Sequence, residues 1–93
     1  MKFGTATTLA DGKLTYHSTV VCEDLGNGKT RLDSGGWRTA TTKKRMNQYA
    51  EAMGYDWEIR QVNHKWFVIP RRDRGVALGI MAWVKSYRDD MEV

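Results

Sequence analysis

A single segment with clear helix signals, residues 42–53, constrains the fold more than any other part of this chain. Thr41 or Thr42 can serve as the N-cap, because a threonine hydroxyl accepts a hydrogen bond from a free N–H of the first turn. Apolar residues then recur at helical spacing, and Gly54 is a natural residue at which to end the helix. This apolar stripe consists of Met46, Tyr49, Ala50 and Met53. The segment therefore predicts an amphipathic helix that packs on another element.

Two segments before the helix have the composition of β-strands. The first, residues 14–22, is rich in threonine and valine and places four apolar side chains on one face at a period of two. These are Leu14, Tyr16, Val20 and Cys22. Gly26-Asn27-Gly28 supplies a turn, and residues 29–33 return as a short strand with Leu32 inward. We therefore predict a hairpin.

A second hairpin is predicted after the helix. Residues 57–62 and 65–69 flank Asn63-His64, a suitable two-residue turn because asparagine tolerates a positive φ. Pro70 cannot donate a ladder hydrogen bond, so it closes the strand. Hairpins on both sides of a helix indicate an α+β domain. We expect a small antiparallel sheet with β-β-α-β-β order and one central helix packed on it.

The two ends of the chain are less clearly patterned. Residues 1–10 are threonine-rich, and we expect either a short edge strand or a loose arm there. Near the other end, Ile80, Val84, Tyr87 and Met91 approach helical spacing, which predicts a C-terminal helix at about 79–91. Alternate residues from 76 to 84 are also apolar, so a strand beginning near 76 is the alternative. With 93 residues the chain allows one modest core, and we predict a single domain, 1–93.

The composition limits the setting and the chemistry. No apolar run approaches the roughly 18–20 residues of a membrane span, and the N-terminus lacks the apolar core of a signal peptide, so we expect a cytosolic protein. Cys22 is the only cysteine, and its valine-rich surroundings predict a buried hydrophobe. His64 is read as a turn residue and His17 as a strand residue. Because no metal-ligand spacing or nucleophile–base grouping stands out, we predict no metal, no cofactor and no enzymatic activity.

Positive charge is concentrated in two places. The formal net charge is +4, and no acidic residue occurs from 34 to 50. We call residues 35–45 the junction segment, and residues 71–74, which carry three arginines, the arginine loop. The dipole of a helix favours acidic residues at its N-terminus, so the cations of the junction segment oppose it. A local rule broken without visible compensation marks a candidate functional site.

The junction segment contains the components of an anion-binding site. Its glycines allow a close backbone approach, and a helix start offers free N–H donors. The spacing of a P-loop and the parallel context of a dinucleotide-binding fold are both missing, so a small nucleotide is not supported. A phosphate backbone, an acidic protein surface and a simple strand-to-helix turn with solvated cations remain open. The candidate binding residues are Trp37, Arg38, Thr39, Thr41, Thr42, Lys43, Lys44, Arg45, Arg71, Arg72 and Arg74.

Some of these residues have two interpretations. A tryptophan beside two glycines can pin the loop to the sheet, so we expect Trp37 in the core; exposed, it would be a stacking platform or an interface anchor. The arginine loop would extend the basic face if the second hairpin ended beside the helix start, and would otherwise be solvated. Lys43, Lys44 and Asn47 lie off the apolar stripe, so we expect them to face water or a ligand.

The junction segment and its surroundings resemble a group of small phage and mobile-element proteins. Their shared core is Ser-Gly-Gly-Trp-x-Thr-x-Thr-Thr-Lys-x-Arg-Met-Asn-Gln, which here occupies residues 34–48. The resemblance extends over about 16–69, including residues 16–21 and 66–68, and is lost after Pro70. It implies a phage or mobile-element origin and carries over no activity and no catalytic residue.

Our leading hypothesis is a non-enzymatic phage accessory protein of the host-cell cytoplasm that binds and inhibits a host macromolecular machine. The partner would be a host protein or nucleoprotein complex that meets the basic residues, and no membrane partner is expected. Anti-defence action, including anti-CRISPR action, is one such role and rests on association with phage biology. The runner-up is a direct DNA- or RNA-binding protein. A third class is a small self-associating structural protein, with Trp66, Trp83 or Tyr87 at the interface.

Overall fold

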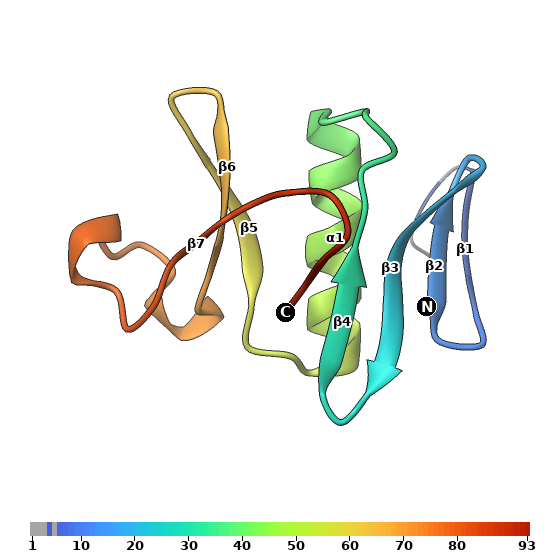
Figure 1. The fold of residues 1–93 in the computed structure, drawn as a ribbon, viewed down its shortest axis with the longest axis horizontal. Coiled ribbons are helices and arrows are strands. Elements are labelled where there is room, and N and C mark those ends of the chain that lie inside the picture. Colours follow the sequence, from blue (N-terminus) through green and yellow to red (C-terminus); the bar gives the residue numbers. More distant parts are fainter. Residues whose placement is uncertain (1–3, 5) are drawn as a thin grey trace.

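The predicted helix and both predicted hairpins are present in the computed structural model, which describes residue 4 and residues 6–93 (Figure 1). The elements in chain order are β1 (Thr7–Ala10), β2 (Lys13–Tyr16), β3 (Thr19–Gly26), β4 (Lys29–Leu32), α1 (Ala40–Met53), β5 (Glu58–Val62), β6 (Lys65–Ile69), β7 (Lys85–Ser86) and β8 (Met91–Glu92). Short 3₁₀ turns occur at Arg71–Asp73 and Leu78–Ile80. The α+β class is confirmed. The strands, however, form two antiparallel sheets instead of the expected single one.

Helix α1 begins earlier than its cap signals predicted. Thr39 is the N-cap, and its hydroxyl accepts a hydrogen bond from the Thr42 N–H at 3.2 Å. The predicted cap at Thr41 or Thr42 was wrong because both residues lie inside the helix, where their backbone is helical. Gly54 ends the helix as predicted, in the left-handed conformation with φ 73°. No helix in the described part of the chain has the length and apolarity needed to cross a membrane.

The larger sheet has the order β1-β2-β3-β4-β8. The predicted strand at 14–22 is divided in two, because the chain reverses at His17-Ser18 and Leu14 pairs with Cys22 across the resulting hairpin. His17, with φ 55°, is therefore a turn residue and not the strand residue that we expected. Of the two expectations for residues 1–10, the edge strand is confirmed at β1; residues 1–3 and 5 lie outside the described residues.

The smaller sheet has the order β5-β6-β7 and matches the predicted second hairpin closely. Asn63 and His64 form its turn with φ values of 50° and 65°, the two positive values that a tight hairpin turn requires. Asn47 joins this sheet to α1, because its side chain accepts from the Ile59 N–H at 2.6 Å and donates to the Ile59 carbonyl at 3.1 Å. The expectation that Asn47 faces water or a ligand was therefore wrong.

The C-terminal segment is extended, so the predicted helix at 79–91 was wrong, as was a strand from 76. Its backbone completes the edges of both sheets: the Tyr87 N–H donates to the Trp66 carbonyl at 3.0 Å, and the Asp90 N–H donates to the Leu32 carbonyl at 2.7 Å. These edge carbonyls are distant in sequence, and pairing with them outweighs a weak helical pattern interrupted by Gly79. Figure 1 shows this segment crossing from β7 to the strands near β4.

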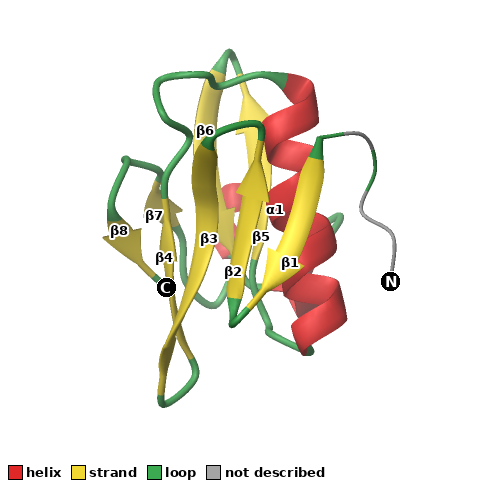
Figure 2. Cartoon of the chain, turned by 90° about the vertical axis from the view of Figure 1, so that its right-hand side faces the viewer, coloured by secondary structure: helices red, strands yellow, loops and turns green. Residues whose placement is uncertain are grey.

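One hydrophobic core joins the helix, both sheets and the C-terminal segment. In Figure 2 the helix lies behind the strands, and Met46, Tyr49 and Ala50 of its stripe are buried, whereas Met53 is 36% exposed. Cys22 is buried as predicted, which raises the pKa of its thiol. Trp66 and Tyr87 are also buried, with ring centroids 5.2 Å apart, whereas Trp83, the third residue considered for a self-association surface, is partly exposed. Self-association itself stays a prediction.

Candidate binding site at the junction of sheet and helix

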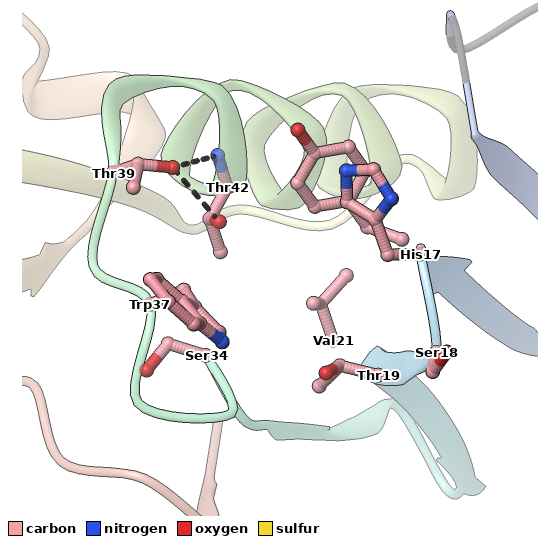
Figure 3. Close-up of a pocket in the computed structure, with 9 residues that line it drawn as sticks. His17, Ser18, Thr19, Val21, Ser34, Trp37, Thr39 and Thr42 are labelled. Atoms are coloured by element: carbon pink, nitrogen blue, oxygen red, sulfur yellow. Dashed lines mark hydrogen bonds between the residues drawn. The ribbon is translucent and has the colours of Figure 1, made fainter.

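A pocket of about 470 Å³ lies between the β2–β3 turn and the chain that connects β4 to α1 (Figure 3). Residues 16–19 and Val21 line one side, and Ser34, Trp37, Thr39 and Thr42 line the other. Three of these residues are buried: Val21, Ser34 and Thr42. Figure 3 shows Trp37 and His17 on opposite sides of the pocket. The pocket therefore borders the junction segment that the sequence singled out.

Trp37 is 71% exposed, so its predicted place in the core was wrong. Gly35 and Gly36, with φ values of 64° and 85°, turn the chain before the side chain can reach the sheet. A Cβ at position 35 would lie 2.7 Å from Thr19 Oγ1 and 2.9 Å from Thr19 Cγ2. Gly35 therefore serves two architectural needs, a left-handed backbone and close contact with β3, and the tryptophan takes the exposed position that this turn creates.

A cluster of hydrogen bonds from the C-terminal segment holds the connection to the helix in place. One oxygen of Asp89 accepts from the Ser34 N–H at 3.0 Å, the Ser34 hydroxyl at 2.8 Å and the Tyr87 hydroxyl at 2.7 Å. Partial burial works to raise the pKa of Asp89, but the hydrogen bonds from Ser34 and Tyr87, together with Arg38, lower it overall. Burial, and secondarily the bond to Asp89, raises the pKa of Tyr87. The segment that carries Trp37 is therefore held at Ser34 by hydrogen bonds to Asp89.

The hydrogen-bonding groups of the pocket are divided into two halves. Thr39 Oγ1 and Thr42 Oγ1 lie 3.1 Å apart and bond each other, and Ser34 is occupied by Asp89. Within the described part of the chain, the polar side chains on the opposite side make no such hydrogen bonds: the Tyr16, Ser18 and Thr19 hydroxyls and the His17 imidazole. The Trp37 indole N–H, on the same side as Thr39, also has no hydrogen-bond partner among the described residues. These groups are free to bind a ligand.

Among the described residues, three of the four cations of the junction segment contact other side chains and Lys44 does not. Lys43 Nζ donates to Gln61 Oε1 of β5 at 3.1 Å, and the Arg38 guanidinium lies 4.9 Å from the centre of the Tyr87 ring. Lys43 thus bonds to the smaller sheet at the surface, while remaining accessible to water as expected. Lys44 is exposed and forms no salt bridge or side-chain hydrogen bond with the described residues. Thr41 is half-buried in the first turn of α1.

Arg45 is buried and holds the helix against the edge of the larger sheet. It donates to the Thr7 hydroxyl at 3.0 Å and to Gln48 Oε1 at 3.0 Å, and it lies 5.9 Å from the centre of the Tyr16 ring. A Cβ at residue 4 would overlap its guanidinium, so Gly4 makes room for it. Arg45 therefore supports the Tyr16 side of the pocket from behind.

Of our two interpretations of the arginine loop, the one in which it extends the basic face of the junction segment was wrong. Because β5 starts just after α1 ends, the antiparallel β6 finishes near the C-terminal end of the helix, away from the junction segment. Each arginine there pairs with a carboxylate: Arg71 with Glu51 at 3.2 Å, Arg72 with Asp56, and Arg74 with Glu58 at 2.6 Å.

Sequence reasoning missed the β2–β3 turn as one wall of the pocket. The turn contains no glycine or proline, and the apolar period of two resumes after it in the same phase, interrupted only at Ser18. The useful signal was the polar pair His17-Ser18, because histidine is enriched among residues with positive φ. Among residue 4 and residues 6–93, no three histidine, cysteine or acidic side chains gather closely enough to hold a metal ion.

Comparison with known proteins places the chain in a phage family. Residues 4–90 match the model of the Kyanoviridae Gp96 protein family. The matched range includes nearly all of the described fold. No curated protein and no solved structure matches the chain significantly. The match agrees with the phage origin that the resemblance implied, and because it covers most of the sequence, the chain belongs to the Kyanoviridae Gp96 protein family.

Proposed function

We propose that this protein is a non-enzymatic phage accessory protein that binds and inhibits a host macromolecular machine, as anti-defence and anti-CRISPR proteins do. Its partner is a host protein or a nucleoprotein complex of the host cytoplasm. Membership of a phage family supports a role during infection. The single observation that carries the proposal is Trp37, a large aromatic side chain that is 71% exposed at the wall of a pocket.

An exposed tryptophan next to a cavity is typical of a binding hot spot. Tryptophan is enriched among the few residues that dominate binding energy, and such residues act together with pockets from which water is excluded. The hydrogen bonds between Ser34 and Asp89 fix the adjoining backbone, so less conformational entropy is lost when a partner binds. Lys44, exposed and without a salt bridge to the described residues, adds the positive charge expected to favour an anionic surface.

Affinity capture from infected host cells, followed by mass spectrometry, tests this proposal. We expect a defined host complex to be recovered with the wild-type protein and lost with Trp37→Ala. Ile80→Ala is the matched control, because Ile80 is 77% exposed and lies in the 3₁₀ turn after the arginine loop. The purified protein should then inhibit the captured complex, and Trp37→Ala should not. Equal recovery with the wild type and Trp37→Ala would contradict the proposed site.

Direct DNA or RNA binding is the second candidate, favoured by the cationic start of α1. A protein that binds through phosphate contacts should retain bare oligonucleotides at low salt, with an affinity that falls log-linearly as salt increases. Lys43→Glu combined with Lys44→Glu should then abolish binding without unfolding the protein. If oligonucleotides bind weakly or not at all while the host complex is still captured, the inhibitor proposal is favoured.

A further inference from the structure

We propose that the pocket holds a nucleobase stacked between Trp37 and His17. The base would come from a single-stranded nucleic acid, such as the nucleic acid of a host nucleoprotein complex, or from a free nucleotide. This inference rests on the proposed use of the pocket as the binding site, and it names the chemistry of the group that enters.

The shape of the pocket suits a flat ring. Its volume of about 470 Å³ is within the roughly 300–1,000 Å³ of pockets that hold small molecules. Trp37 and His17 occupy opposite sides of the space in Figure 3. In the proposed complex the base stacks against these aromatic groups, since base–aromatic stacking is a main way in which proteins hold single strands.

The β2–β3 turn fixes the position of His17. Its backbone has φ 55°, a conformation that costs free energy for any residue with a Cβ. The turn brings the imidazole against the ring of Tyr16, with centroids 4.4 Å apart and planes at 52°. Tyr16 is in turn supported by Arg45. The turn and the Tyr16 ring therefore hold the imidazole at the rim of the pocket.

The polar groups of the pocket favour a base over an aromatic protein side chain. The hydroxyls of Tyr16, Ser18 and Thr19 and the ring nitrogens of His17 have no hydrogen-bond partner among the described residues. Each nucleobase carries several donors and acceptors along its edges. A phenylalanine ring carries none, and a tyrosine or tryptophan carries one polar group, so either side chain would leave most of these groups unmatched.

The charges indicate that the neutral part of a nucleotide enters. No lysine, arginine, aspartate or glutamate lines the pocket, so a phosphate group would find no ionic partner inside. Arg38, Lys43 and Arg45 are engaged within the molecule, which leaves Lys44 as the cation of the junction segment most available to a phosphate. Binding should therefore depend on stacking, and its log–log salt slope should be about −0.7 or shallower, as one phosphate contact to a single strand gives.

NMR titration of the ¹⁵N-labelled protein tests the inference directly. The probes are the four ribonucleoside 5′-monophosphates and a ten-nucleotide single-stranded oligouridine, with a tyrosine- and tryptophan-containing peptide for comparison. We expect the indole signal of Trp37 to shift on adding nucleotide, while those of the buried Trp57 and Trp66 stay unchanged. Trp37→Ala and His17→Asn should each weaken binding about 10-fold or more, the range of one lost stacking contact. Asparagine tolerates the left-handed backbone at position 17, so this variant removes the ring and keeps the turn.

The results of the titration distinguish three ligands: a free nucleotide, a single strand and an aromatic peptide. Saturable binding of a mononucleotide supports a free nucleotide, and much tighter binding of the oligomer supports a strand. Ile80→Ala should bind as the wild type does, and urea midpoints of all variants should confirm that they are folded. Absence of any nucleotide-induced shift at millimolar concentration overturns the inference, as does a response to the peptide alone. Since host capture needs no added nucleotide, it can succeed when this titration fails, which distinguishes the inference from the proposed function.

Discussion

The junction segment and the arginine loop are both basic in the sequence, yet they lie near opposite ends of α1 and use their charges differently. Every arginine in the arginine loop pairs with a carboxylate, from Glu51, Asp56 or Glu58. In the junction segment, Lys43 and Arg45 instead bind neutral oxygens of Gln61, Thr7 and Gln48. The junction segment also borders a pocket at whose wall Trp37 is exposed.

This difference shows that the number of cations in a segment is a poor guide to its use. The arginine loop pairs with acids in the last turn of the helix and shortly after it, so it offers little charge to a partner. The cations of the junction segment mainly fasten α1 to strands on both sides, and this leaves the neighbouring turn free to present Trp37. The feature that distinguishes the junction segment is thus a pocket lined by uncharged side chains and histidine, with Lys44 exposed in the same segment, and the proposed binding uses that pocket.

The largest expected effect on stability comes from replacing Gly35 in the junction segment, compared with Gly75 beside the arginine loop. Gly35→Ala should lower the free energy of unfolding by about 2–4 kcal/mol, because it adds both left-handed backbone strain and a clash with Thr19. Gly75→Ala, next to the arginine loop, should cost about 1–2 kcal/mol, because its φ is 87° and a Cβ there would meet no atom within 4 Å. Urea denaturation of the two variants measures both values. Equal destabilisation would show that the contact between Gly35 and β3 contributes nothing.

A smaller effect is expected from the anchor of the junction segment. Asp89→Asn should lower stability by about 1 kcal/mol at pH 7, a modest value because Asp89 is itself partly exposed. The pKa of Asp89 is lowered in the folded protein, so its contribution is present above the unfolded value of about 3.9 and is lost as the pH falls through the folded value. The difference between wild type and variant should therefore narrow at pH 3, in parallel urea titrations.

Tyr87→Phe serves as the matched control for this pH dependence. It removes one hydrogen bond to Asp89 and keeps the carboxylate, so the wild-type acid sensitivity should be reduced and not abolished. If Asp89→Asn and the wild type differ equally at pH 7 and pH 3, the hydrogen bonds from Ser34 and Tyr87 do not stabilise the ionised form.

The parts of the fold that sequence patterns predicted correctly are those with local causes. The end of α1 at Gly54 and the Asn63-His64 turn depend on backbone conformations that neighbouring residues dictate. The C-terminal segment was misread because its conformation depends on edges formed by Leu32 and Trp66, far away in the chain. Apolar spacing alone does not reveal that the edges of β4 and β6 have backbone carbonyls with which the C-terminal segment can pair.

The candidate site was only half predictable for a related reason. Trp37, Thr39 and Thr42 belong to the junction segment, whose glycines and cations drew notice in the sequence. The other wall, residues 16–19, comes from a hairpin hidden within one continuous alternating pattern. Whether a cation is free also depends on partners such as Gln61 and Thr7, which approach only after folding.

The smallest expected effect on stability comes from a substitution in the arginine loop, Arg72→Gln. Arg72→Gln removes an exposed ion pair with Asp56 but leaves the backbone N–H of residue 72 bonded to the same carboxylate at 3.0 Å. Exposed ion pairs contribute little to stability because water and salt screen them. We therefore expect a smaller shift in the urea midpoint than for any substitution above, and no change in Trp37-dependent binding. Loss of binding on this substitution would show that the two basic segments act as one surface, contrary to the division between them drawn from the ion pairs.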